Sequence, residues 1–178
     1  VSSIALSDAM QLKAASFYGE AANSDIENSA YLAEFSYQPF DNLSVSLQTG
    51  FVIEKNGFLG STSEGAFAFD DETSTTFYSA AMEYDITEDT SLFGSYSYGI
   101  SNSKPSEGTL FSDFGEFKSD GYSAGLNHKL SGDSSVSVAV SQPLRVRSAS
   151  ATLNLGTGRD IEGNVTRQDV RVDLSPLG

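Results

Sequence analysis

Hydrophobic and polar residues alternate with a period of two along most of the chain, in segments separated by Asn, Asp, Gly and Ser. Side chains of a β-strand point alternately to its two faces, so this pattern is typical of strands with one apolar and one polar face. The separating residues suit turns because they tolerate a positive φ or bond to their own backbone. The predicted strands are 11–22, 29–39, 43–55, 75–87, 90–102, 118–130, 134–147, 149–157 and 164–174.

The order of these strands predicts an all-β fold, an antiparallel up-and-down meander of about 8–10 strands that forms a β-barrel. Residues 1–178 are expected to form a single domain, since the length is that of one domain. Residues 1–12 are the exception to the alternation, and there we expect a linker or a short helix N-capped by Ser7. The last strand, 164–174, is expected to pair with 149–157.

One face of the predicted strands is apolar, and the other consists mostly of small polar residues. The apolar face contains Leu43, Val45, Leu47, Phe51, Tyr78, Ala80, Met82, Tyr84, Ile86, Leu92, Tyr96, Tyr98, Ile100, Tyr122, Ala124, Leu126, Leu130, Val136, Val138, Val140, Ala151, Leu153, Leu155, Val170, Val172 and Leu174. The polar face contains Ser44, Ser46, Gln48, Gly50, Ser91, Ser95, Ser97, Gly99, Ser123, Gly125, Asn127, Ser135, Ser137 and Ser141.

Two geometries fit these faces. In an outer-membrane barrel, the apolar face meets lipid and the small polar residues line a narrow lumen. In a soluble barrel or sandwich, the apolar face points inward and the polar face is the exterior. Tyrosines on the apolar face would suit an aromatic girdle near the strand ends, although tyrosine is common in any half-buried strand. These tyrosines are Tyr78, Tyr84, Tyr96, Tyr98 and Tyr122.

The composition argues against catalysis and against nucleic acid. The chain is acidic, with a net charge of −14, whereas phosphate binding needs clustered Lys and Arg. There is no Cys, which excludes disulfides and thiol nucleophiles, and His128 is the single histidine. No apolar run is long enough for a transmembrane helix, and the first residues lack the features of a signal peptide.

Each candidate site has a plainer structural explanation. His128 lies in the apolar register between Leu126 and Leu130, where we expect a structural role. The acidic residues Asp70, Asp71 and Glu72, with Glu64 and Asp85, could bind Ca²⁺, but no EF-hand pattern is present and a solvated acidic loop is expected. The run 156–158 is expected to be a hairpin turn rather than a phosphate cradle. We therefore predict no catalytic, cofactor-binding or metal-binding residue.

The arginines all follow residue 140, whereas all the lysines precede it. Arg145 and Arg147 share one face of a predicted strand. The last strand places Arg167, Asp169, Arg171 and Asp173 on the face opposite Val170 and Val172. A polar lumen or packed interior, which we favour, would tolerate this ladder because cross-strand pairs satisfy its charges. A solvent-exposed ladder is the alternative.

Four segments resemble a known family. They are Gly57–Ser61 followed by Gly65–Phe69, then Ser91–Gly99, then Ser141–Val146 with Ser150–Leu153, and finally Val172–Pro176. In this order and spacing they resemble the C-terminal autotransporter-like β-barrel region of subtilisin-type (S8) serine proteases of Gram-negative bacteria. The resemblance covers about residues 45–178, and its most specific part is the Ser-Gln-Pro-Leu-Arg-Val run at 141–146.

The resemblance implies a translocator domain, an outer-membrane barrel that follows a secreted subtilase passenger and anchors it at the cell surface. Its implied partners are outer-membrane lipid and the N-terminal protease passenger. The protease is not in this chain, so its triad maps to no residue. Barrels of this family have twelve strands and continue past the Leu-Ser-Pro segment, whereas nine strands are predicted here and the chain stops at Gly178. Either the barrel is incomplete at its C-terminus, or it closes with fewer strands, or it does not close in a membrane.

The leading hypothesis is therefore a non-catalytic translocator or anchor barrel in the outer membrane. The alternative is a secreted, soluble, extracellular β-domain that self-assembles by edge-strand pairing, as a fibre, surface-layer or binding module. The mean hydropathy of −0.21 and the acidic charge motivate this alternative. An independent hydrolase would have to depend on His128, and it is the least expected class.

Overall fold

A computed structural model describes residues 1–20, 27–55, 72–130 and 134–175, and its regular structure in these ranges is entirely β. The strands of the larger sheet are β1 (Ser2–Ser7), β2 (Met10–Glu20), β3 (Glu27–Phe40), β4 (Leu43–Lys55), β5 (Glu72–Thr87), β6 (Thr90–Asn102), β8 (Phe117–Lys129) and β9 (Ser135–Ser148). The strands of the smaller sheet are β7 (Phe111–Phe114), β10 (Ser150–Arg159) and β11 (Val165–Asp173).

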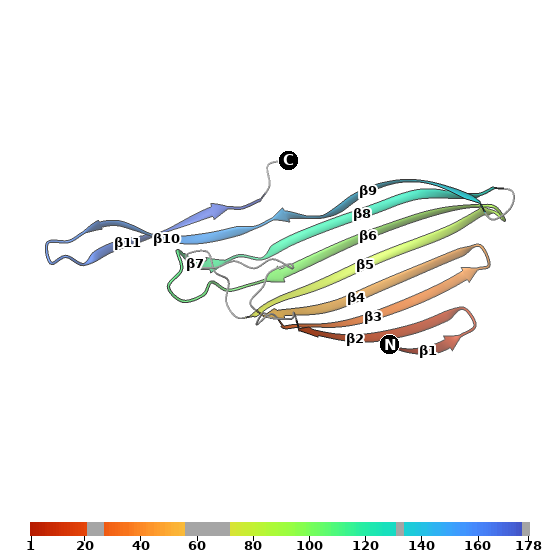
Figure 1. The fold of residues 1–178 in the computed structure, drawn as a ribbon, viewed down its shortest axis with the longest axis horizontal. Helices are drawn as coiled ribbons and strands as arrows, with labels where there is room; N and C mark the ends of the chain where they lie inside the picture. Colours follow the sequence, from red (N-terminus) through yellow and green to blue (C-terminus); the bar gives the residue numbers. More distant parts are fainter. Residues whose placement is uncertain (21–26, 56–71, 131–133, 176–178) are drawn as a thin grey trace.

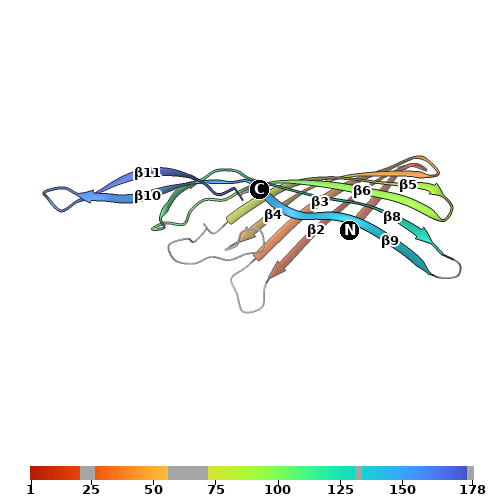
Figure 2. The ribbon, with the colours of Figure 1, turned by 90° about the horizontal axis from the view of Figure 1, so that it is seen from above.

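The larger sheet is an antiparallel meander in the order β1-β2-β3-β4-β5-β6-β8-β9 (Figure 1). The prediction of an all-β antiparallel meander is therefore confirmed. In the described residues β1 and β9 are the two edges of this sheet and do not pair with each other, so the sheet is open. It is nevertheless strongly curved (Figure 2).

Several details differ from the sequence-based expectation. Residues 2–7 form β1 instead of a linker or helix, because their backbones pair with residues 10–14 of β2. Ser7 Oγ accepts a hydrogen bond from Ala9 N (3.3 Å) within the hairpin turn. A short strand, β7, lies in the expected loop 103–116. The run 156–158 is not a turn but part of β10, with a register shift between Gly156 and Gly158. The expected pairing of the last strand with 149–157 is confirmed, since β10 pairs with β11.

The connections of the larger sheet differ in length at its two ends. At one end, the turn end, β1–β2, β3–β4 and β5–β6 are joined by the two-residue turns 8–9, 41–42 and 88–89, and β8–β9 by residues 130–134. At the other end, the loop end, the connections span 21–26, 56–71 and 103–116, the last of which contains β7. Side chains help to fix the short turns: Asp89 N donates to Thr87 Oγ1 (3.3 Å), and Asn42 Nδ2 donates to the carbonyl oxygen of Asp85 (3.4 Å).

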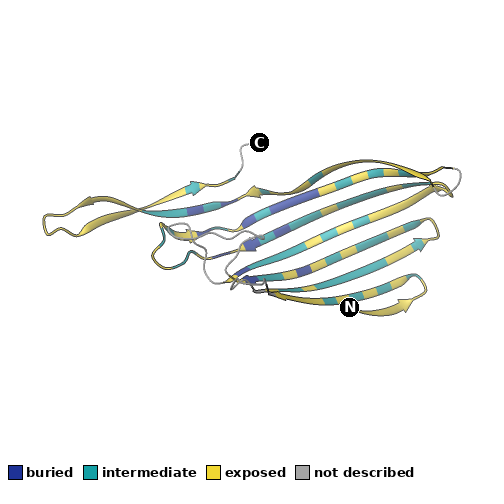
Figure 3. Ribbon diagram, viewed as in Figure 1, coloured by how far each residue is buried: buried dark blue, intermediate teal, exposed yellow. Residues whose placement is uncertain are grey.

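The smaller sheet extends the larger one beyond its loop end (Figure 1). The chain passes from β9 into β10 at Ala149 without reversing its direction. In the same way, it passes from β7 into β8 without a reversal. A small apolar cluster lies at this junction and consists of Phe114, Phe117, Ala149 and Ala151, with Phe111, Val146 and Val172 packed against it. Buried positions gather toward the loop end of the molecule, while the rest of the larger sheet alternates between exposed and half-buried positions (Figure 3).

Candidate functional site

The most unusual surface of the chain is the apolar face of the larger sheet. Cross-strand pairing aligns the apolar residues of successive strands in rows. One row is Leu12, Phe35, Leu47, Ala80, Tyr96 and Tyr122, and another is Leu43, Tyr84, Leu92, Leu126 and Val138. We call the face that carries these two rows and the parallel rows between them the apolar face. The register of the strands confirms that the alternation sorts the residues onto two faces.

Much of the apolar face is exposed. The exposed fraction is 53% for Leu47, 46% for Met82 and 70% for Val138. In the middle of β5 and of β8, from Tyr78 to Met82 and from Tyr122 to Leu126, the apolar-face residues are exposed and the residues between them are half-buried. Water-soluble monomers rarely leave a contiguous apolar patch of more than a few hundred Å² uncovered. Within the described residues, this face therefore has the character of an interaction surface.

The five predicted girdle tyrosines all lie on the apolar face. Tyr84 lies toward the turn end, and Tyr78 and Tyr98 lie toward the loop end. Tyr96 and Tyr122 are paired with each other in the middle of the face. Further aromatic residues of the same face lie on β3 and β4, with Tyr37 and Phe40 toward the turn end and Tyr31 and Phe51 toward the loop end.

The opposite face, which we call the polar face, is held together by hydroxyl pairs. The pairs Ser79–Ser97, Ser95–Ser123 and Thr75–Ser101 each have an Oγ–Oγ or Oγ1–Oγ distance of 2.8 Å, and Thr73–Ser103 follows at 3.0 Å. Each pair bridges neighbouring strands, β5 with β6 or β6 with β8, or lies just beyond their ends. Serine and threonine can both donate and accept, so hydroxyls that face each other satisfy one another without water.

One ionic cluster lies on the polar face. Lys13 Nζ on β2 donates to Glu34 Oε1 on β3 at 2.9 Å. The same carboxylate accepts hydrogen bonds from Gln48 Nε2 (2.7 Å) and Ser36 Oγ (3.0 Å). The Glu34 side chain is only 20% exposed, and these three donors compensate for its partial removal from water. The sequence indicated Gln48 as a polar-face residue but missed Lys13 and Glu34, which become neighbours only when β2, β3 and β4 pair.

The polar face is the concave face of the sheet. A Cβ atom placed on Gly125, on the polar face, would lie 2.6 Å from the carbonyl oxygen of Val138 and 2.8 Å from Ala139 Cβ. A Cβ atom placed on Gly94, on the apolar face, would have no neighbour closer than Ser123 O at 3.8 Å. Side chains converge on the inner side of a bent sheet and spread apart on the outer side. The difference therefore explains why Ser and Gly dominate the inner face.

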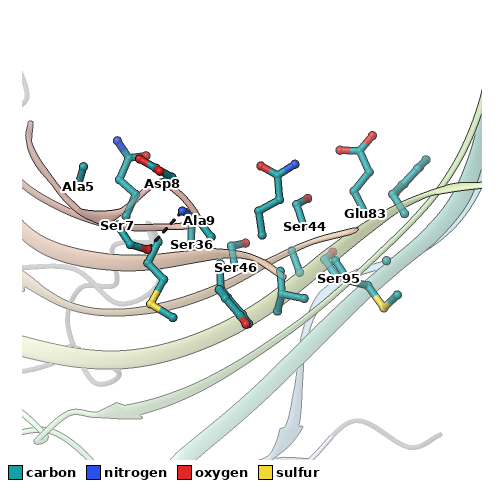
Figure 4. Close-up of a pocket in the computed structure, with 18 of the residues that line it drawn as sticks. Ala5, Ser7, Asp8, Ala9, Ser36, Ser44, Ser46, Glu83 and Ser95 are labelled. Carbon is teal, nitrogen blue, oxygen red and sulfur yellow. Dashed lines mark hydrogen bonds between the residues drawn. The ribbon is translucent and has the colours of Figure 1, made fainter. Parts of the chain in front are cut away.

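A groove of about 590 Å³ lies in this concave face near the turn end. Its lining includes Ser36, Ser44, Ser46, Glu83, Ser95 and Ser123. Ser44, Ser46, Glu83 and Ser95 lie on one side of the bent ribbon, toward the centre of its curvature (Figure 4). The lining offers hydroxyls and the carboxylates of Asp8 and Glu83, which can bind polar groups of a peptide or water.

The candidate residues for chemistry are not assembled into a site in the described part of the chain. His128 is exposed and its Nδ1 lies 2.9 Å from Thr90 Oγ1, the cross-strand neighbour. Glu72 and Asp85 lie at opposite ends of β5, so they cannot share one Ca²⁺ ion, while Glu64, Asp70 and Asp71 lie outside the described residues. The described residues contain no group of three acidic or His side chains positioned to hold a metal.

The arginine ladder of β11 is exposed on the extension beyond the loop end, not in a packed interior. Arg167 Nη1 donates to Asn154 Oδ1 (3.0 Å), and Asn154 Nδ2 donates to Asp169 Oδ1 (2.7 Å). Arg171 Nη2 donates to Ser150 Oγ (3.3 Å). The charged side chains of β11 are thus hydrogen-bonded mostly to the neutral side chains of Asn154 and Ser150 on β10.

The tip of the β10–β11 hairpin is fixed by Asp160. Its Oδ1 accepts hydrogen bonds from Glu162 N (2.9 Å) and Asn164 N (2.8 Å), and its Oδ2 accepts one from Asn164 Nδ2 (3.0 Å). These bonds hold the pKa of Asp160 below its ordinary value, and the bond from the Asn164 side chain has the largest effect. Gly163 supplies the positive φ of +89° that the turn requires.

A buried acid that the sequence analysis missed interrupts the apolar face toward its loop end. Asp120 is 5% exposed and lies in the same register as Tyr98, in the row next to Tyr96 and Tyr122. Its carboxylate is 3.2 Å from Arg147 Nη1, and it accepts weaker hydrogen bonds from Tyr96 Oη and Gln142 Nε2. The signal in the sequence was an acidic residue two positions before Tyr122, at a position where the alternation requires an apolar one.

Comparison with known proteins finds no match: no family model fits the chain, and no curated protein or solved structure matches it. Within the residues that the structure describes, no helix has the length and apolar character needed to cross a membrane.

Proposed function

We propose that this chain forms the wall of an outer-membrane β-barrel and serves as the non-catalytic translocator or anchor of a secreted, autotransporter-like subtilase. The main support for the proposal is the curvature of the sheet, which places the apolar face on the convex side and the face with small polar side chains on the concave side. This is the arrangement of a barrel whose exterior meets lipid and whose interior holds water or a polar chain. A water-soluble barrel requires the opposite arrangement.

The dimensions of the strands support the proposal. A strand needs about 9–11 tilted residues to cross a bilayer. On β4, the apolar-face positions from Leu43 to Ile53 cover such a length and are apolar except for Thr49. The aromatic residues toward both ends of β3–β5 fit the interfacial girdles of such barrels.

The connections also support it. Outer-membrane barrels have short turns on the periplasmic side and longer loops on the extracellular side. The two-residue turns 8–9, 41–42 and 88–89 and the longer connections at the loop end follow this rule. In this orientation the β10–β11 hairpin would project from the cell surface.

The link to a subtilase passenger rests on the sequence resemblance. The segment Ser91–Gly99 lies in β6, and Ser141–Val146 lies in the part of β9 where the register shifts against β8. The segment Ser150–Leu153 begins β10, and Val172–Pro176 begins at the end of β11. The first motif, 57–69, lies outside the described residues. In the proposed role, the polar face provides hydroxyl partners for an extended chain in transit, and no residue of this chain performs chemistry.

Because the chain contains no Trp, one introduced Trp can report which face meets lipid. Met82→Trp and Glu83→Trp place the indole at neighbouring positions of β5, on the apolar and the polar face respectively. Each variant is folded into vesicles that contain lipids brominated in their acyl chains, which quench nearby Trp fluorescence. We expect strong quenching of Met82→Trp and weak quenching of Glu83→Trp.

The two positions are a matched pair, since they lie at the same depth. Strong quenching of Glu83→Trp alone would show that the faces are reversed. No quenching of either variant, with the chain remaining in the aqueous fraction, would overturn the membrane assignment.

The open sheet supports a second function, a secreted soluble β-domain that assembles through its edge strands. Exposed strand edges present unpaired N–H and C=O groups that can extend a neighbouring sheet. This alternative requires the apolar faces to cover one another in the assembly. It predicts large water-soluble particles without lipid, and the quenching experiment separates it from the membrane proposal.

A further inference from the structure

The middle of the apolar face carries no charge in the described residues, whereas cationic side chains gather at its loop end on β8 and β9. Its uncharged positions lie within Met10–Tyr18, Ser29–Tyr37, Leu43–Ile53, Tyr78–Ile86, Leu92–Ile100, Tyr122–Leu126 and Val136–Gln142.

Three cations lie beyond this uncharged region, and we call them the cationic cluster. Lys118 continues the apolar-face register of β8, and Arg145 of β9 pairs with Asp120 of the same face. Arg147 is the extra residue of β9 at the next register shift, and its side chain reaches Asp120 from there. Three of the ten Lys and Arg residues are therefore in one place, in a chain whose net charge is −14.

The neighbouring acids leave much of the cluster's hydrogen-bonding capacity unused. Asp120 binds Nη1 of Arg147 at 3.2 Å, and the Arg147 side chain is still 59% exposed. Glu116 Oε2 lies 3.4 Å from Lys118 Nζ in an exposed pair. Arg145 has no ion pair with any described residue. Because a guanidinium has five N–H donors and an ammonium has three, the cluster can bind a further anion.

The cationic cluster lies beside tyrosines of the apolar face. Tyr98 is the cross-strand partner of Asp120, and the Tyr96 hydroxyl donates to the Asp120 carboxylate (3.4 Å). Tyrosines of a membrane barrel gather at the level of the lipid headgroups, where Lys and Arg are also tolerated on the lipid-facing side. In the proposed orientation, the loop end faces outward, so the cluster meets the headgroups of the outer leaflet.

A groove of about 580 Å³ in the apolar face ends at the same tyrosines, Tyr96 and Tyr98. It is hollow because Ala33, Thr49 and Ala80 contribute small side chains between the larger residues of neighbouring strands. An elongated apolar groove on a lipid-facing surface has room for an acyl chain. A phosphorylated lipid fits this combination, because its acyl chains are attached to an anionic headgroup.

We infer that the cationic cluster and this groove bind one phosphorylated lipid of the outer leaflet. A headgroup phosphate is bound by Lys118, Arg145 and Arg147, and an acyl chain lies in the groove. Guanidinium groups suit this role because their paired N–H donors match phosphate oxygens. Asp120 is a positioning residue, since its buried carboxylate holds Arg147 at the cluster. In a Gram-negative outer membrane, the matching lipid is the phosphorylated glycolipid lipid A.

The inference rests on the proposed function, which places the loop end in the outer leaflet. It does not depend on how the barrel closes. A further strand beside β9 would pair with the backbone of β9 and leave the side chains of the convex face on the outer surface.

Lipid binding is measured by native mass spectrometry of the full chain released from micelles of an uncharged detergent, with lipid A as the probe. The test variant Lys118→Gln/Arg145→Gln removes two charges and keeps the pair of Arg147 and Asp120, which preserves the fold. The matched control Arg167→Gln/Arg171→Gln removes two charges from the exposed extension.

We expect the test variant to bind lipid A about tenfold more weakly than the native chain, because two charge-assisted contacts are lost. The control variant should bind it as the native chain does. Unchanged binding by the test variant would overturn the inference. An equal loss in both variants would also overturn it, because net charge alone would then explain the binding.

The two parts of the lipid are tested separately. Lipid A without its phosphates should bind about tenfold more weakly to the native chain, and equal affinity would overturn the headgroup site. Ala80→Phe fills the groove and should weaken lipid A binding several-fold, whereas Ala124→Phe lies on the same face outside this groove and should not. Equal binding by these two variants would overturn the acyl-chain site.

The quenching of Met82→Trp reports membrane insertion independently of lipid A. Strong quenching without lipid A binding would reject this inference and leave the proposed function standing. Binding of lipid A that depends on Lys118 and Arg145, without quenching in vesicles, would reject the membrane function and leave the lipid site standing.

Discussion

Crowding on the concave face is the main constraint at the scale of single residues. Gly125 lies opposite Phe93 of β6 and beside Ala139 of β9, and the Phe93 ring occupies the space above the glycine. Gly50 has the same relation to Phe77 of β5. At these two positions a large aromatic ring fits on the inner side of the sheet because the neighbouring strand contributes no side chain there. The glycines and serines of this face are therefore selected by volume as well as by polarity.

Gly125→Ala is expected to destabilise the protein by about 1–3 kcal/mol, because the added methyl group overlaps with the backbone of β9. Gly94→Ala is the control, since Gly94 lies on the convex face and its nearest neighbour is 3.8 Å away. The control is expected to leave the free energy of unfolding unchanged or slightly higher, because alanine reduces the entropy of the unfolded chain. Urea unfolding of both variants in lipid vesicles gives the comparison. Equal losses would show that curvature does not crowd the polar face.

At the scale of elements, the uninterrupted course from β9 into β10 determines the shape of the loop end. The two parts of this long stretch have different partners: β9 pairs with β8, and β10 pairs with β7 and β11. The register shifts between Asp120 and Tyr122, where Pro143 and Leu144 of β9 face the single residue Gly121. Proline has no N–H to donate, so it is tolerated at an edge strand and at a bulge, and here it lies at both.

The small core at this junction should depend on Val172. This side chain is half-buried against the cluster of Phe114, Phe117, Ala149 and Ala151 and pairs with Ala151. Val172→Asp places a carboxylate against apolar atoms and is expected to cost about 2 kcal/mol, which lowers the thermal midpoint by about 4–8 °C in a chain of this size.

Asp173→Asn is the neighbouring control on the opposite face of β11. The carboxylate of Asp173 is exposed and accepts a hydrogen bond from Ser175 N (2.8 Å), and the Ser175 bonds lower the pKa of Asp173. An amide oxygen can accept the same bond, so the thermal midpoint should change much less than for Val172→Asp. A larger loss for Asp173→Asn would mean that the faces of β11 were assigned the wrong way round.

At the scale of the whole molecule, the difference between the turn end and the loop end defines an orientation. Three of the four connections at the turn end are two-residue turns that contain Asp, Asn or Glu, and the loop end carries the longer connections and the β10–β11 extension (Figure 1). All five arginines lie at the loop end or on the extension. If the sheet spans the outer membrane, the two ends face different compartments.

Single-cysteine labelling on cells tests this orientation. Glu162→Cys places a thiol in the exposed turn of the β10–β11 hairpin, and Glu88→Cys places one in the turn between β5 and β6 at the other end. A membrane-impermeant maleimide is expected to label Glu162→Cys on intact cells, and to label Glu88→Cys only after the outer membrane is permeabilised. The opposite order would invert the orientation, and equal labelling of both on intact cells would contradict a spanning sheet.

Most strands and both of their faces follow from the order of residues in the chain. A period of two fixes which side chains share a face, so Leu47, Tyr96 and Val138 could be assigned to one surface before their neighbours were known. Turn residues located most hairpins for the same local reason. The exceptions are informative: β1 and β7 were missed because strands this short carry too few alternations, and 156–158 contains glycines but lies within a strand.

Which face is concave could not be predicted from the alternation, because curvature arises from contacts between strands and not from the order of residues within one. Pairing also brought Lys13 to Glu34 and Arg147 to Asp120. The strand pairing also showed that β10 continues in the direction of β9 and does not fold back on it. The sequence could not show this, because the partners that distinguish the two cases, β8 and β7, lie far away in the chain. The alternation therefore fixed the two surfaces of this sheet, while the packing of side chains between strands decided which surface faces outward.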